Sequence, residues 1–171
     1  LWLFPTIYKY VTETGNLAFM DEVIPYANRG EATVYEHLKR AIDFSMNHLG
    51  KHGMPAGLYA DWNDCLRLGK EGESTFVAMQ LYYAMNILRK FAEYKQDKET
   101  AAYLDEKQEE LGKLLQELCW NEDRFIRGFT EAGEVIGKRT DPEANVWLNP
   151  QSWAVISGLA KGDQADMALE R

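Results

Sequence analysis

The sequence predicts a mainly α-helical protein with one small β-hairpin. Apolar residues recur at helical spacing through nearly the whole chain. A strand-like pattern occurs only between Phe125 and Arg139, where two short β-rich runs flank a turn that contains glycine. The chain has 171 residues, of which 46% are hydrophobic and 27% charged. This composition can supply a core, and it excludes a disordered tail or a collagen-like fibre.

Five segments carry the helical pattern. The segment 73–94 is apolar on most sides over its first four turns, which predicts a buried helix, whereas 98–119 sets an apolar stripe against a charged face that we expect in solvent. Gly15 ends the first segment, and Pro150 precedes the start of the last. The five predicted helices span residues 1–14, 33–49, 73–94, 98–119 and 151–160.

These helices come in pairs, in which a mostly buried helix is followed by one with a charged back. Such alternation is typical of a helical-hairpin array or a toroid of helix pairs. The chain also begins with Leu1 inside an apolar run and ends in a helix-like segment at 167–171. We therefore expect residues 1–171 to be a piece of a larger protein.

The charge of the chain limits its partners. The formal net charge is -8 and the pI is about 4.9, which argues against nucleic acid or an anionic membrane surface as a partner. No run approaches the about 18 uninterrupted apolar residues that a membrane helix needs. A small or neutral substrate fits this composition better.

Neither cysteines nor histidines form a metal-binding pattern. Cys65 and Cys119 have no CxxC or Cys/His spacing, so we expect reduced thiols and a cytoplasmic location. His37 lies in mid-helix, and His48 and His52 flank a glycine turn. We expect no metal.

The most irregular segment, residues 52–69, contains a dense polar and aromatic cluster at 61–64, Asp-Trp-Asn-Asp. The indole of Trp62 can stack on the apolar face of a sugar, Asp61 and the amide of Asn63 can bind hydroxyls, and the second carboxyl group, Asp64, can protonate a leaving oxygen. Alternatively, Asp61 caps the following turn and Trp62 belongs to the core. The spacing alone leaves both interpretations open.

Several motifs in this order resemble one known family. Ala-Asp-Trp-Asn-Asp-Cys-Leu at 60–66 is preceded by Gly-Met-Pro-Ala-Gly-Leu and followed by Gly-Glu-Ser-Thr-Phe-Val-Ala. Together with the stretches at 1–3, 30–38 and 148–158, these motifs are similar to the inverting β-glycoside phosphorylases of glycoside hydrolase family 94, the cellobiose and chitobiose phosphorylases. The resemblance covers essentially the whole chain.

The resemblance implies that residues 1–171 are a fragment of a catalytic (α/α)6-barrel domain. The family cleaves a β-linked disaccharide, cellobiose or N,N'-diacetylchitobiose, with inorganic phosphate as co-substrate and no cofactor. The products are an α-sugar 1-phosphate and a free sugar. Family members are commonly dimers, so a homodimer is implied for the full-length protein, although no segment of this chain can be identified as the contact.

The resemblance also assigns roles to residues. Asp64 is the implied general acid, and Trp62 lines the sugar subsites beside it. Asp61 is structural or binds a hydroxyl, as Asn63 does. Gln151 stands at a predicted helix start that faces one mouth of a toroid, where it can reach a substrate.

One acid suffices for phosphorolysis, because phosphate is already an anionic nucleophile. An inverting hydrolase instead needs two carboxyl groups about 6.5 to 9.5 Å apart to activate a water. Glu73 opens a predicted helix, where a carboxylate suits the helix dipole, so we expect it to support the helix rather than to contact a substrate. Two alternatives stay open: a hydrolase that pairs Asp64 with Asp61 or Glu73, and a non-catalytic carbohydrate-binding segment.

The family elements that hold the glycone sugar and the phosphate lie largely outside these residues. No Gly-rich phosphate loop or arginine cluster replaces them in the chain. We therefore expect the isolated fragment to be inactive and, because its apolar helix faces lack their cover, to associate or unfold.

Overall fold

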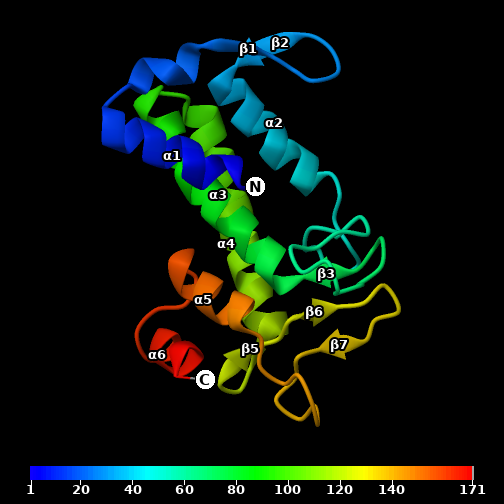
Figure 1. Ribbon diagram of the computed structural model, residues 1–171. Coiled ribbons are helices and arrows are strands. Elements are labelled where there is room, and N and C mark those ends of the chain that lie inside the picture. The colour runs from blue at the N-terminus through cyan, green and yellow to red at the C-terminus, as the bar shows by residue number, and fades with distance from the viewer. Residues whose placement is uncertain (171) are drawn as a thin grey trace.

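The computed structural model describes residues 1–170, and helices make up most of it (Figure 1). A 3-10 turn, η1 (Leu17–Asp21), follows the first helix. The six α-helices of the described residues are α1 (Leu3–Thr14), α2 (Val34–Met46), α3 (Thr75–Tyr94), α4 (Lys98–Cys119), α5 (Leu148–Ile156) and α6 (Asp163–Leu169).

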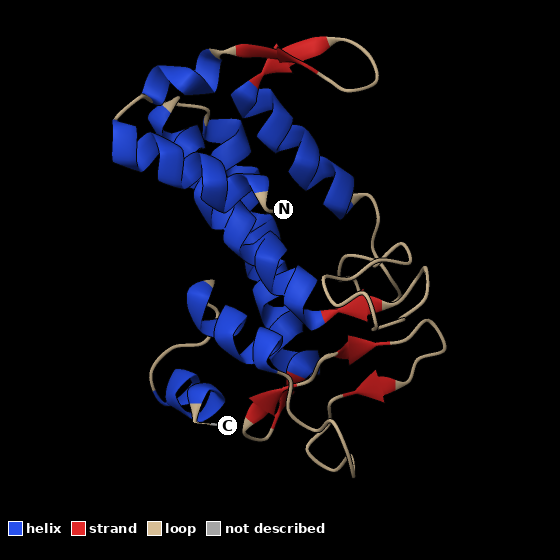
Figure 2. Cartoon of the chain, viewed as in Figure 1, coloured by secondary structure: helices blue, strands red, loops and turns tan. Residues whose placement is uncertain are grey.

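The long helices α3 and α4 form the centre of the molecule. They are joined by residues 95–97 and pack side by side, and α1, α2 and α5 also contact α3 (Figure 1). Figure 2 shows α1 and α2 at one end of this pair and α5, α6 and most of the strands at the other. Helix α3 is buried on most sides, as its sequence predicted.

Short strands form three small antiparallel sheets. The predicted hairpin between Phe125 and Arg139 is present, but the prediction of a single hairpin was wrong, because strands of two or three residues are too short to show an alternating pattern. The sheets of residues 1–170 are β1 (Val23–Pro25) with β2 (Glu31–Thr33), β4 (Trp120–Asn121) with β5 (Arg124–Phe125), and β3 (Glu73–Ser74), β6 (Gly128–Phe129) and β7 (Val135–Ile136) in the order β3-β6-β7.

Side-chain caps fix where the helices begin. Ser74 Oγ accepts a hydrogen bond from the backbone N–H of Val77 at the start of α3, and Thr33 Oγ1 does the same for Glu36 at the start of α2. Helix α5 begins at Leu148, earlier than predicted, because Pro150 is tolerated in a first turn that needs no N–H donor there. The turn η1 and the extent of α6 were not predicted.

The (α/α)6 toroid stays a prediction. The α3–α4 pair packs against α1, α2 and α5, and several large apolar side chains on these three helices are exposed, among them Leu3, Phe44 and Leu148. Among residues 1–170, we find no helix whose length and apolar character would let it cross a membrane.

Candidate functional site

The candidate site lies on an irregular loop, residues 47–72, that links α2 to α3. The loop folds back on itself, because the N–H of Gly57 donates to the carbonyl of Gly72 at 2.8 Å and the N–H of Leu58 donates to that of Lys70 at 3.0 Å. The segment Asp-Trp-Asn-Asp at 61–64 lies in the chain between these two paired parts of the loop.

Glu73 anchors the first part of this loop from inside. Its side chain is 1% exposed. It accepts hydrogen bonds from the backbone N–H groups of His52 and Met54, each at 3.0 Å, and from Nδ1 of His52. A Cβ at Gly50 would overlap the Glu73 side chain, so the close fit requires glycine there. Glu73 therefore has a structural role, as expected. It acts by binding the N–H groups of the loop rather than by interacting with the dipole of α3.

Asp61 is buried in an ion pair that sequence reasoning missed. Its side chain is 1% exposed and pairs with Nη2 of Arg127, which is fully buried. Asp61 Oδ1 also accepts from the backbone N–H of Asn63 at 2.9 Å, which is the turn cap of the structural alternative. Arg127 stands in a run with Ile126 and Gly128 that reads as a strand, and an arginine in such an apolar run was the available signal.

Trp62 does not follow that structural alternative. Its side chain is 62% exposed, and its ring meets Phe76 edge-on at 6.4 Å between centroids. Asn63 Oδ1 accepts from the N–H of Cys65 at 3.1 Å, so the oxygen of this amide closes the turn. An exposed indole beside a polar turn is a surface on which a sugar ring can stack.

Asp64 is exposed and lines an open hollow of about 700 Å³. The hollow lies between the loop and the turn that joins β6 to β7, and Arg67, Thr130 and Glu134 also line it. Its volume is in the range of small-molecule sites. Trp62 is not among the residues that line this hollow.

The turn between β6 and β7 is clamped to the loop through Glu131. The N–H of Glu131 donates to the carbonyl of Leu68 at 2.8 Å, and its carboxylate accepts from the N–H of Lys70 at 2.8 Å. Lys51 Nζ reaches the carbonyl of Glu131 at 3.2 Å. These bonds fix the wall of the hollow opposite Asp64.

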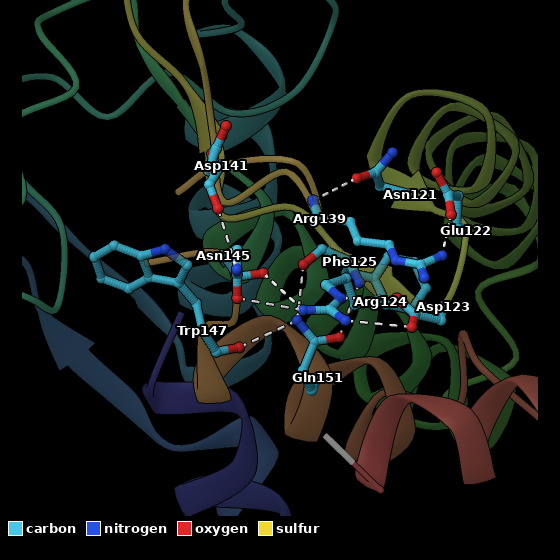
Figure 3. A network of polar contacts seen from close by, with 10 residues as sticks. All are labelled: Asn121, Glu122, Asp123, Arg124, Phe125, Arg139, Asp141, Asn145, Trp147 and Gln151. Carbon is cyan, nitrogen blue, oxygen red and sulfur yellow. Dashed lines mark hydrogen bonds and ion pairs between the residues drawn. The ribbon is translucent and has the colours of Figure 1, made fainter. Parts of the chain in front are cut away.

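Gln151 lies in the interior, at the start of α5 (Figure 3). Its amide accepts from the N–H of Phe125 at 2.8 Å and donates to the carbonyls of Phe125, at 2.7 Å, and Trp147, at 3.1 Å. The residue is 3% exposed and does not line the hollow beside Asp64. Its predicted contact with a substrate stays a prediction, and this geometry does not support it.

The two cysteines have different surroundings. Cys65 is exposed next to Asp64. Cys119 is buried at the end of α4 with its Sγ 3.7 Å from Sδ of Met54, and burial raises the pKa of its thiol to about 12. Cys119 is therefore an unreactive core residue. Within residues 1–170 no group of three or more Cys, His, Asp or Glu residues is arranged to hold a metal ion.

Of the three carboxyl groups considered from the sequence, Asp64 is accessible and two are enclosed, and the exposed Glu131 and Glu134 also line the hollow. Asp64 faces solvent in the hollow, whereas Asp61 and Glu73 are enclosed and accept hydrogen bonds from named donors. The hollow is lined by more acidic than basic side chains, a poor surface for an anion. Its chemistry fits protonation of a bound neutral molecule.

One family model matches the whole chain. The model for the catalytic domain of the glycosyl hydrolase 94 superfamily matches residues 1–171. The chain is 41% identical over 177 residues to an N,N'-diacetylchitobiose phosphorylase of Vibrio proteolyticus and 35% identical over 174 residues to a solabiose phosphorylase of Paenibacillus borealis. These alignments cover 99% of this chain and 21% and 23% of those proteins, so the chain spans about a fifth of the length of the curated relatives it matches.

The fold has a counterpart among solved structures. A GH78 family rhamnosidase of Bacillus sp. GL1 superposes with a TM-score of 0.74 at 17% identity, over 98% of this chain and 16% of that one. At this identity the likeness shows the fold alone.

Proposed function

Residues 1–171 belong to the catalytic domain of the glycosyl hydrolase 94 superfamily, and from this premise we propose that the full-length protein is an inverting disaccharide phosphorylase with Asp64 as its general acid. The reaction is reversible phosphorolysis of a β-linked disaccharide. It yields an α-sugar 1-phosphate and a free sugar, and it uses inorganic phosphate with no cofactor.

The bond changes need one proton donor. An oxygen of phosphate forms a bond to the anomeric carbon from the face opposite the glycosidic bond. The glycosidic bond breaks as the new bond forms. The carboxyl group of Asp64 gives its proton to the departing glycosidic oxygen, which leaves as the hydroxyl of the free sugar. Attack from the opposite face inverts the configuration from β to α.

The observation that carries the proposal is the contrast between Asp64 and the other two carboxylates. Asp64 is open to the hollow, whereas Asp61 is paired with Arg127 and Glu73 accepts bonds from His52 and Met54. Asp61 is among the residues that line the hollow, but the side chains of Asp61 and Glu73 are each only 1% exposed, so they offer a water there little access. The pairing of Asp64 with Asp61 or Glu73 that an inverting hydrolase would need is therefore disfavoured.

The substrate side of the proposal extends to the neighbours of Asp64. Trp62 stacks on a sugar ring, and Asn63 donates from its amide nitrogen to a hydroxyl. Asp61 serves the same subsite by fixing the turn. Gln151 remains a candidate contact only if α5 shifts from the position described here, because its amide is bonded to the Phe125 backbone.

Cellobiose and N,N'-diacetylchitobiose are the proposed substrates. Two curated relatives at 41% and 40% identity are N,N'-diacetylchitobiose phosphorylases of Vibrio species, which favours the chitobiose unit. Phosphate binding is proposed for other parts of the full-length protein, and the acidic lining of the hollow supports this. A homodimer is proposed for that protein on the family resemblance.

The decisive test is Asp64→Asn in the full-length protein. We expect phosphorolysis to fall by at least about a thousandfold, because an amide cannot supply the proton, while disaccharide binding measured by calorimetry changes little. Asp43→Asn, the same substitution at an exposed position on α2, is the matched control and should leave turnover unchanged. Retained phosphate-dependent cleavage in Asp64→Asn would refute the assignment.

Product analysis separates the two enzymatic alternatives. With wild-type protein and disaccharide, we expect a sugar 1-phosphate that forms only when phosphate is present. Two free sugars produced without phosphate would identify a hydrolase. No binding of any disaccharide by the full-length protein would favour a non-catalytic segment.

A further inference from the structure

We propose that Arg127 is the positioning residue that holds Asp64 in its reactive place, a role that rests on the proposed function of Asp64. Arg127 touches neither the hollow nor Asp64 itself. It acts through Asp61, three residues before Asp64 in the chain.

The side chain of Arg127 joins the loop to the start of α3. Its Nη2 donates to Oδ1 of Asp61, and its Nη1 donates to Oγ of Ser74 at 2.7 Å. Ser74 is also the N-cap of α3. One planar guanidinium thus ties the turn at 61–64 to the N-cap of the buried helix α3, with two bonds whose directions are fixed relative to each other.

The backbone of Arg127 is held just as firmly. Its N–H donates to the carbonyl of Ile136 at 2.7 Å, and its carbonyl accepts from the N–H of Thr75 at 3.1 Å. It therefore lies between β7 and the start of α3, beside the pairing of β6 with β3. The guanidinium also lies over the ring of Trp147 at 5.6 Å and that of Phe76 at 5.9 Å. These contacts constrain both the backbone and the guanidinium group of Arg127, which binds Asp61.

A short chain of contacts passes this position on to Asp64. Asp61 Oδ1, the same oxygen that Arg127 binds, accepts from the N–H of Asn63, and Asn63 Oδ1 accepts from the N–H of Cys65. Asp64 stands between these two capped amides. A displacement of the Asp61 carboxylate therefore shifts the backbone on both sides of Asp64.

Burial makes this link sensitive to substitution. Arg127 and Asp61 are 0% and 1% exposed, so solvent cannot replace a lost partner. Asp61 Oδ2 and Arg127 Nε make no hydrogen bond within the described residues, so the pair has no second set of partners to fall back on. A purely stabilising ion pair is not expected to leave both groups partly unsatisfied. The arrangement instead fits a role in fixing one position of the Asp61 carboxylate, and with it the turn at 61–64.

The test is Arg127→Met in the full-length protein, with kcat measured on two kinds of glycoside. A disaccharide needs a proton on its leaving oxygen, whereas a dinitrophenyl β-glycoside releases a stable phenolate without one. If Arg127 positions the acid, kcat for the disaccharide falls about 100-fold with little change in KM, and kcat for the dinitrophenyl glycoside falls by less than about threefold. Arg127→Lys keeps the positive charge without the paired bonds. Its kcat for the disaccharide should lie between those of wild type and Arg127→Met.

Two further variants keep the result interpretable. Asp61→Asn with Arg127→Met removes both charges but keeps the turn cap, so it should fold and show the same selective loss. Arg124→Met removes a neighbouring arginine that is 10% exposed and paired with Asp123 in the network of Figure 3. It should leave kcat unchanged for both glycosides.

Exchange and activity together separate the outcomes. We expect faster hydrogen exchange at the Asn63 and Cys65 amides in Arg127→Met than in Arg124→Met. Equal losses on both glycosides, unchanged exchange, or full disaccharide turnover would each overturn the positioning role while leaving the proposed function standing. A wild-type protein without phosphorolysis would instead refute the proposed function.

Discussion

The outer face of α4 and the loop at 47–72 are both rich in charge, yet they use it in opposite ways. On α4 the pair Lys113–Glu109 spans 2.6 Å with both side chains 68% exposed. In the loop and its anchors, Glu73 and the pair of Asp61 with Arg127 are almost completely enclosed. Exposed pairs are screened by solvent and contribute little, whereas an enclosed charge must keep its partners. The enclosed charges therefore hold the loop that carries the exposed Asp64, whereas the exposed pairs of α4 add little to the stability of the fold.

Glu73→Gln should give the largest effect on stability. The backbone N–H groups of His52 and Met54 bond the same oxygen, Oε1, so glutamine keeps these two bonds only as weaker, neutral ones, and its amide nitrogen replaces the Oε2 that faces His52. We expect the free energy of local opening at the His52 and Met54 amides to fall by about 2 to 4 kcal/mol, measured by hydrogen exchange.

The matched control for that change is Glu71→Gln, which lies two residues earlier and is exposed. It should leave the His52 and Met54 amides unaffected. Equal exchange in the two variants would show that enclosure does not set the value of these charges, and the contrast with α4 would fail.

Asp97 at the start of α4 lies between the two extremes and gives an intermediate effect. Hydrogen bonds from the Thr100 hydroxyl and backbone N–H hold the pKa of its carboxyl group at about 2, with further help from Tyr35 and Lys39. Because the folded pKa is depressed, the stabilisation is complete above the ordinary value near 4 and is lost as the pH falls towards 2. The side chain is 26% exposed, so we expect a loss of about 1 kcal/mol rather than more.

Asp97→Asn isolates that titration, since asparagine caps a helix as well as aspartate but does not ionise. The stability difference between wild type and variant, followed by hydrogen exchange at the Thr100 amide, should disappear between about pH 4 and pH 2. A difference that is constant with pH would contradict the assigned pKa.

The scaffold could be predicted from the sequence, and the site only in part. The helices α3 and α4 were placed within two residues of their bounds, because long periodic segments and capping residues such as Ser74 and Asp97 act locally. Asp64 and Trp62 are exposed, and the binding role inferred for them from residue types stays a prediction.

What could not be predicted depends on contacts between distant residues. The partner of Asp61 is Arg127, 66 positions away, and the loop anchor of Glu73 lies 21 positions before it. Gln151 was assigned to a substrate from its place at a helix start, but its amide is used by the Phe125 backbone of another segment. No periodicity reports such pairings, because each is set by how β3, β6 and β7 meet the loop.

Lys113→Gln should give the smallest effect and sharpens the comparison from the exposed side. Glutamine keeps the helix propensity of lysine and removes the pair with Glu109, whose carboxyl pKa is lowered by that hydrogen bond. Because water and salt screen both groups, we expect the melting temperature to stay within about 1 °C of wild type at low salt and to coincide with it at high salt. A loss of stability comparable to that of Glu73→Gln would mean that the exposure of a charged pair does not decide how much it stabilises this protein.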